Sequence, residues 1–155
     1  MKNIEKVRRV LLVGLSDRAF YEGTMVKSAV YEMPSLTIAT LAGAVKVAGN
    51  VPEAFEYDLY VDGDGELVKR LESLQPDVVA ITFVNTPLFD EMVRVTKLVK
   101  SLNSGISVIA GGAHATCFPE ECINGGVDVV VRGEGDLTLP ELLVASPAGL
   151  SLIHI

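Results

Sequence analysis

Two short apolar runs that each end in a glycine-containing loop constrain the fold of this chain more than any other feature. Residues 106–110 are followed by Gly111 and Gly112 and then by a helical stretch, and residues 127–131 are followed by residues 132–135, RGEG. In an open parallel sheet, ligands bind in the crevice beyond the carboxyl ends of the strands. The two loops therefore predict the position of a ligand-binding site.

The rest of the chain alternates between apolar runs typical of strands and amphipathic stretches typical of helices. One helix is predicted to begin at Pro34-Ser35 and to end at Gly49-Asn50. The further strands are predicted over residues 8–15, 54–61 and 77–84, and the further helices over residues 66–74, 88–102 and 137–145. Five such alternations predict an α/β fold: a doubly wound, five-stranded parallel sheet with helices on both faces.

The polarity of the strands predicts their order in the sheet. In residues 54–61 apolar and polar side chains alternate, as in an edge strand with one solvent-exposed face. The strands predicted over residues 8–15 and 77–84 contain the continuous apolar run 10–13 and an apolar run broken only by Thr82, which suits central strands that are buried on both faces. We therefore expect the flavodoxin-like order 2-1-3-4-5, with the switch point between the first and third strands.

Composition limits the class of protein. With 155 residues, of which 49% are hydrophobic, the chain is long enough for one domain with its own core. A net charge of −7 argues against a nucleic-acid-binding surface, and no apolar run approaches the roughly 20 residues of a membrane span. No signal-peptide segment precedes the first strand, and Cys117 and Cys122 have no third partner. We expect a globular cytoplasmic domain with reduced thiols.

Several familiar catalytic and phosphate-binding motifs are absent from the sequence. Residues 14–17, GLSD, lack the glycine spacing of a dinucleotide-binding loop, and no Walker A loop or nucleophile elbow occurs. A phosphoacceptor domain needs acidic residues at the ends of the first and third strands, where this chain has Gly14 and Asn85. The chain is therefore expected to contain no catalytic residues of its own.

The last six residues differ in character from the rest. Residues 150–155, LSLIHI, resemble the in-frame translation of a sequencing adapter. We therefore expect the native domain to occupy residues 1–149 and residues 150–155 to be a non-native tail. His154 is excluded from the site for this reason.

Four motifs taken together resemble one known family. They are Pro34-Ser35-Leu36 at the start of the first helix, residues 76–82 (PDVVAIT), residues 111–121 (GGAHATCFPEE) and residues 129–135 (VVVRGEG). With these motifs the chain, to about residue 145, resembles the cobalamin (B12)-binding domain at the N-terminus of B12-dependent radical SAM proteins. The resemblance implies that the chain is a fragment of a longer enzyme.

The resemblance implies a slot for the nucleotide tail of cobalamin. Gly111 and Gly112 would let the backbone approach the tail closely, Thr82 would offer a hydroxyl, and Glu134 would accept from an amide or a ribose hydroxyl. Simpler explanations remain open: a tight turn, a hydroxyl satisfied within the sheet, and a carboxylate favoured at a helix N-terminus. The implied cofactor-binding residues are Pro34, Ser35, Leu36, Thr82, Val84, Gly111, Gly112, His114, Ala115, Thr116, Gly133, Glu134 and Gly135.

The resemblance also implies how the cobalt is held. The loop after the first strand has no histidine, which implies base-off cobalamin without a histidine lower ligand. His114 follows the fourth strand and is expected to cap or pack in the Gly-Gly loop rather than to bind cobalt. Residues 16–33 form a long loop with several large apolar side chains, and we expect cobalamin to order it over the corrin face.

The chemistry of the parent enzyme is implied only by the resemblance. A radical SAM domain, absent from this chain, would follow and would bind S-adenosylmethionine and an iron–sulfur cluster. Cys117 and Cys122 lack the Cys-x-x-x-Cys-x-x-Cys spacing of such a cluster, so this fragment is expected to hold no metal itself. The parent is implied to transfer methyl groups or to rearrange carbon skeletons. The alternative is a flavodoxin-like docking or substrate-recognition module that no longer binds cobalamin.

Overall fold

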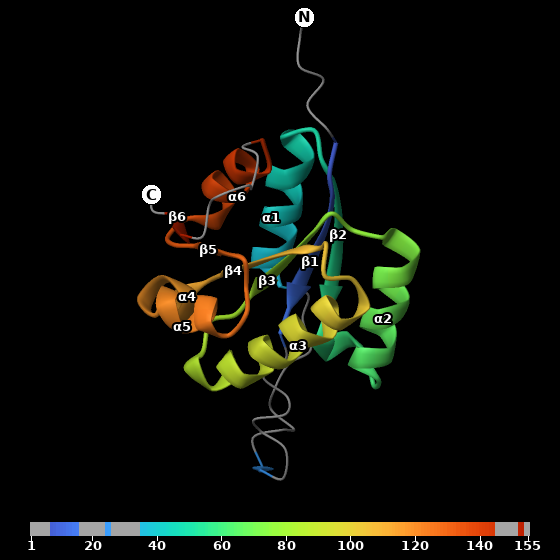
Figure 1. Ribbon diagram of the computed structural model, residues 1–155, viewed down its shortest axis with the longest axis vertical. Helices are drawn as coiled ribbons and strands as arrows, with labels where there is room; N and C mark the ends of the chain where they lie inside the picture. The colour runs from blue at the N-terminus through green and yellow to red at the C-terminus, as the bar shows by residue number, and fades with distance from the viewer. Residues whose placement is uncertain (1–6, 16–23, 26–34, 145–151, 154–155) are drawn as a thin grey trace, which may run out of the picture.

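The computed structural model describes residues 7–15, 24–25, 35–144 and 152–153. It forms a parallel sheet with helices on both faces (Figure 1). In chain order the elements are β1 (Arg9–Gly14), α1 (Leu36–Val47), β2 (Val51–Glu56), η2 (Tyr57–Leu59), α2 (Gly63–Leu74), β3 (Val78–Thr82), η3 (Thr86–Leu88), α3 (Phe89–Leu102), β4 (Ser107–Gly111), α4 (Ala113–Cys117), α5 (Pro119–Asn124), β5 (Val129–Val131), α6 (Gly135–Val144) and β6 (Leu152–Ile153).

The strand order confirms the predicted doubly wound topology. The sheet runs β2-β1-β3-β4-β5-β6, and every pair is parallel. Because β2 lies on one side of β1 and β3 on the other, the switch point falls between β1 and β3, as expected. The two-residue β6 pairs with β5 and was not predicted. It lies in the tail that sequence analysis sets apart from the domain.

Successive strand residues point to opposite faces of the sheet and pack into two separate cores. Val10 and Leu12 of β1 face α1 and α6, together with Ile38 and Leu142. Leu11 and Val13 face α2 and α3, where buried residues of both helices cover them. Both cores are almost wholly apolar, and each fully buried aliphatic side chain stabilises the fold by about 1.5–3 kcal/mol.

The edge strand lies earlier in the chain than predicted. The alternation of polarity predicts a strand over residues 54–61, whereas β2 spans Val51–Glu56 and includes Pro52. Proline is tolerated in a strand when its nitrogen faces an open edge, and here the N–H of Val51 donates to the carbonyl of Arg8 on the β1 side (2.9 Å). After Glu56 the chain bends into η2, which leaves Leu59 47% exposed instead of in the core. The edge position itself is confirmed.

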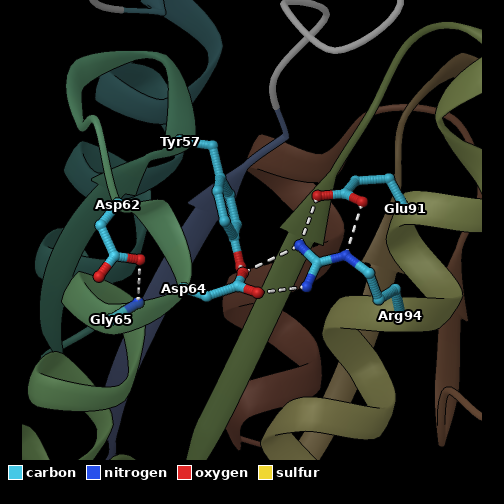
Figure 2. Close-up of polar contacts among 6 residues, drawn as sticks. All are labelled: Tyr57, Asp62, Asp64, Gly65, Glu91 and Arg94. Atoms are coloured by element: carbon cyan, nitrogen blue, oxygen red, sulfur yellow. Dashed lines mark hydrogen bonds and ion pairs between the residues drawn. The ribbon is translucent and has the colours of Figure 1, made fainter.

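Two helix starts depend on side-chain caps. The Ser35 hydroxyl accepts from the Ile38 N–H (3.4 Å), and the Ser35 N–H donates to the Glu56 carboxylate (2.8 Å), so α1 begins where predicted. α2 begins three residues before the predicted Glu66, because the Asp62 carboxylate accepts from the Gly65 N–H (2.9 Å; Figure 2). Residues 63–65 therefore form the first turn of this helix.

An ion-pair network joins α2 to α3 (Figure 2). The Arg94 guanidinium donates to both carboxylate oxygens of Asp64 and to both of Glu91, with the Arg94–Glu91 hydrogen bonds at 2.7 and 2.8 Å. The hydroxyl of Tyr57 donates to Asp64 (3.2 Å). The hydrogen bond from Arg94 lowers the pKa of Asp64, and burial raises the pKa of the Tyr57 phenol. Asp64 and Arg94 therefore stay charged, and the Tyr57 phenol stays neutral, at neutral pH.

Candidate functional site

A cleft of about 380 Å³ opens at the carboxyl ends of the strands, between α1 and α6. It lies where the two glycine loops predicted a site. Strands, loops and both helices contribute to it: the lining residues are Leu36, Thr37, Thr40, Leu41, Ala80, Ile81, Thr82, Ile109, Gly111, Gly112, Val131, Gly133, Glu134, Gly135, Asp136 and Leu139.

The cleft changes character with depth. The inner residues Ala80, Ile109 and Leu139 are aliphatic and at most 8% exposed. Among the exposed lining residues, Thr37 and Thr40 carry hydroxyl groups and Glu134 carries a carboxylate, beside the apolar Leu36. The half-buried Thr82 lies between these zones, two residues along β3 from Ala80. The cleft therefore suits a ligand with an apolar inner end and a polar outer part.

The adjacent glycines Gly111 and Gly112 have different structural roles. A Cβ on Gly111 would meet only Val131, at 3.8 Å, and would extend into the cleft. Gly112 has φ of +112°, and a Cβ there would lie 2.2 Å from the carbonyl oxygen of Phe83. Gly111 therefore leaves room for a ligand, whereas Gly112 lets the loop after β4 pack against the segment after β3.

Thr116 ties the two glycine loops together. Its hydroxyl donates to the Gly112 carbonyl (2.9 Å) and accepts from the Gly133 N–H (3.1 Å). The Arg132 side chain donates to the backbone carbonyl of Thr116 (3.1 Å). Thr116 does not line the cleft, but it links the loop after β4 to the loop after β5, which form one end of it.

His114 lies on the other face of the sheet. Its side chain is 1% exposed and packs among the rings of Phe83, Phe89 and Phe118, with centroids 5.1–5.4 Å away. Its Nδ1 lies 3.2 Å from the Thr86 hydroxyl. Among the described residues Nε2 has no hydrogen-bond partner. The ring therefore packs in the α3-side core, away from the cleft.

The structure brings together seven of the predicted cofactor-binding residues. Leu36, Thr82, Gly111, Gly112, Gly133, Glu134 and Gly135 all line the cleft. Ser35 caps α1 beside it, and Ala115 is buried in the α3-side core. Val84 follows β3 and is 65% exposed without lining the cleft. Pro34 and nearly all of the loop 16–33 lie outside the described residues.

Sequence reasoning missed the side walls of the cleft. Thr37, Thr40 and Leu41 lie one helical turn apart on α1, and Asp136 and Leu139 do so on α6. Within β3, Ala80 precedes the predicted Thr82 by two residues and therefore points to the same face. Helical and strand periodicity, extended from the predicted residues, would have found these positions.

The described part of the chain offers no resident metal site. Within it, no group of three or more His, Cys, Asp or Glu side chains is arranged to hold a metal ion.

Cys122 is buried, and burial raises the pKa of its thiol to about 11, so it is a poor nucleophile near neutral pH. None of the helices in this part of the chain is both long and apolar enough to cross a membrane.

Comparison with known proteins identifies the family. Residues 23–143 match the B12 binding domain. The uncharacterized methyltransferase PH0819 of Pyrococcus horikoshii is 34% identical over 125 residues, which are 77% of this chain but only 26% of that protein. The chain thus spans about a quarter of this relative.

Two solved structures share the fold. A cobalamin-binding protein from Desulfitobacterium hafniense has a TM-score of 0.59 at 18% identity, covering 90% of this chain and 60% of that one. The apo form of OxsB, a cobalamin-dependent S-adenosylmethionine radical enzyme, has a TM-score of 0.59 at 16% identity, covering 89% of this chain and 18% of that one. These structures show the shared fold, and the match over residues 23–143 establishes that the chain belongs to the B12 binding domain family.

Proposed function

We propose that this chain binds cobalamin base-off, with the nucleotide tail in the cleft and the corrin ring over its mouth. The observation that carries the proposal is the space beside Gly111, which any larger side chain would fill. It lies at the carboxyl ends of β3, β4 and β5, in a chain of the B12 binding domain family.

The cleft fits a nucleotide tail in size and polarity. A volume of about 380 Å³ lies at the lower end of small-molecule pockets, about 300–1,000 Å³, and suits the tail rather than the whole cofactor. The aliphatic inner end suits an aromatic base, and the hydroxyls of Thr37, Thr40 and Thr82 can bond to the sugar and its linkages. Glu134 at the mouth can accept from ribose hydroxyls or corrin amides.

The position of His114 supports cobalt coordination without a histidine below the ring. Its imidazole is enclosed by three phenylalanine rings on the α3 side, and Thr86 lies within hydrogen-bond distance of Nδ1. Reaching the cleft would require this core to open. We therefore assign His114 to packing rather than to metal binding.

We further propose that the chain serves as the N-terminal cofactor domain of a cytoplasmic radical SAM enzyme that transfers methyl groups or rearranges carbon skeletons. Two similarities support this: PH0819 is described as a methyltransferase, and OxsB is a cobalamin-dependent S-adenosylmethionine radical enzyme. When bound, cobalamin supplies a cobalt that carries a methyl group or takes part in radical chemistry. This chain's residues would bind and orient it. A following domain would bind S-adenosylmethionine and an iron–sulfur cluster.

Binding of hydroxocobalamin tests the proposal. The purified chain, mixed with a small excess of hydroxocobalamin, is expected to retain the colour through gel filtration and to show a base-off absorption spectrum. Protein that elutes colourless after incubation at micromolar cobalamin would contradict the proposal. It would instead favour a flavodoxin-like docking or substrate-recognition module, whose partner would bind over the exposed side chains of Leu36, Val84 and Leu137.

A further inference from the structure

We infer that the cleft selects among corrinoids by the polarity of the lower base: it accepts dimethylbenzimidazole and disfavours purines such as adenine. This inference rests on the proposed function, because it assumes that the nucleotide tail enters the cleft. It concerns which member of the corrinoid class the chain retains.

The inner end of the cleft offers no side-chain hydrogen-bond partner. Ala80, Ile109 and Leu139 line it, and each is at most 8% exposed. All three side chains are aliphatic, so none can donate to or accept from a base. A polar edge buried against them would lose its hydrogen bonds to water and gain none.

The backbone N–H and C=O groups at the inner end already form hydrogen bonds within the sheet. β3 and β4 each have a strand on both sides, and Ala80 is in register with Leu12 of β1 and with Ile109 of β4. Ile109 is in turn in register with Val129 of β5. The N–H and C=O groups of central strands are used by the sheet ladder. Backbone groups at this depth therefore cannot replace the missing side-chain partners.

The first hydroxyl along β3 is that of Thr82, two residues from Ala80, or about 7 Å further out at roughly 3.3 Å per strand residue. This spacing matches the two ends of dimethylbenzimidazole. Its dimethyl edge can lie on the aliphatic zone while its free imidazole nitrogen accepts from the Thr82 hydroxyl. Adenine would place its amino group and ring nitrogens in the aliphatic zone instead.

Discrimination of this kind is expected to be strong. A site that leaves a polar edge of the ligand without partners usually binds that ligand about ten- to hundred-fold more weakly. We therefore expect the corrinoid with an adenine base to bind at least about ten-fold more weakly than cobalamin. A polar side chain placed at the inner end should reduce this ratio.

Ala80 and Ala110 provide a matched pair of positions for the test. Both are buried in the central strands β3 and β4, and they are 8% and 0% exposed. Ala80 lines the inner end of the cleft, whereas Ala110 faces the α2/α3 side. Ala80→Ser adds a hydroxyl at the inner end with little change in volume, and Ala110→Ser adds the same group to the same sheet outside the cleft. Each variant buries one added hydroxyl, so both should lose some stability.

The experiment is a titration of the chain and both variants with cobalamin, with the adenine-base analogue and with cobinamide, which lacks the tail, followed by absorbance. We expect at least a ten-fold preference for cobalamin over the adenine analogue, weaker binding of cobinamide, and a ratio reduced about three-fold or more by Ala80→Ser but not by Ala110→Ser. Equal affinity for the two bases, or an equal effect of the two variants, would overturn the inference alone. Failure to bind cobalamin, or binding of cobinamide as tightly as cobalamin, would overturn the proposed tail site and the inference with it.

Discussion

The two faces of the sheet differ most where the strands end. On the α1/α6 face, Thr82 and Gly111 leave a cleft open between the helices. On the α2/α3 face, the rings of Phe83 and His114 fill the corresponding space. Thr82 and Phe83 are neighbours in the chain, but strand alternation sends their side chains to opposite faces. One step in sequence thus separates a side chain that lines the cleft from one that fills the core.

This difference shows how a domain can keep an under-packed cleft and still fold. Empty space beside a core costs contacts that close packing would have made. Here the other face compensates with a cluster of aromatic rings and with the Arg94 network between α2 and α3. We expect substitutions on the first face to change ligand binding and substitutions on the second to change stability.

The largest effect is expected from filling the cleft. Gly111→Val should weaken cobalamin binding by about a hundred-fold or more, because its side chain would occupy the space of the tail. The stability cost should be about 1 kcal/mol or less, since a Cβ there meets only Val131 at 3.8 Å. Cobalamin titration and thermal unfolding measure the two quantities.

Gly112→Ala is the contrasting variant for this prediction. Its Cβ would lie 2.2 Å from the Phe83 carbonyl oxygen at a φ of +112°, so it should lower the melting temperature strongly. If Gly111→Val binds cobalamin as well as the parent chain does, the tail occupies another site.

A smaller effect is expected from loosening the loops. Thr116→Val removes the hydroxyl that joins Gly112 to Gly133 and should weaken cobalamin binding about ten-fold, while Thr116→Ser should retain near-parental affinity. In the absence of cobalamin, the Gly133 amide should exchange with solvent faster in Thr116→Val only. Unchanged exchange of that amide would show that this hydrogen bond does not hold the loops together.

Removing the ring at the centre of the aromatic cluster tests the other face. His114→Ala should lower the unfolding free energy by about 2–4 kcal/mol, because it leaves a cavity among three phenylalanine rings. The absorption spectrum of bound cobalamin should remain base-off and unshifted. A shift of the cobalt bands in this variant would mean that His114 coordinates the metal.

The smallest effect is a pH dependence of stability from the α2–α3 network. Arg94 lowers the pKa of Asp64 below its ordinary value near 3.8, so the stabilisation is present above about pH 4 and is lost as the pH falls through the lowered pKa. Both side chains are nearly half exposed, so it should amount to less than about 1 kcal/mol. Thermal unfolding between pH 7 and pH 2.5 should show a smaller acid-induced loss in Arg94→Gln. An equal loss in both proteins would contradict the assignment.

Local signals in the sequence were sufficient for most of the fold. Unbroken apolar runs predicted the central strands, and the Pro34-Ser35 pair predicted the start of α1, which Ser35 does cap. The second strand was misplaced because residues 54–61 alternate in polarity as a strand does. The strand ends at Glu56, and Tyr57 begins η2 with its hydroxyl donating to Asp64 of α2 (3.2 Å). This contact with the following helix leaves no mark in the polarity pattern of residues 54–61.

The site was predicted in position but not in composition. Glycines at two strand ends indicated the rim and led to Gly111, Gly133 and Glu134, which line the cleft. The side walls follow from helical periodicity once Leu36 and Gly135 are taken as cleft residues, but the packing of α1 beside α6 is set by contacts between distant segments. His114 illustrates the same limit, because its neighbour Gly112 lines the cleft while its own ring points to the other face.

Pro52 has a consequence for how copies of this domain meet in concentrated solution. Strand N–H groups alternate in direction, and that of Val51 donates toward β1, so the outer edge of β2 has the backbone nitrogens of Pro52, Ala54 and Glu56. The first of these carries no hydrogen. An exposed strand edge recruits strands from other chains through its free donors, and proline interrupts that pairing. Pro52 thus protects the open edge of β2 from edge-to-edge aggregation.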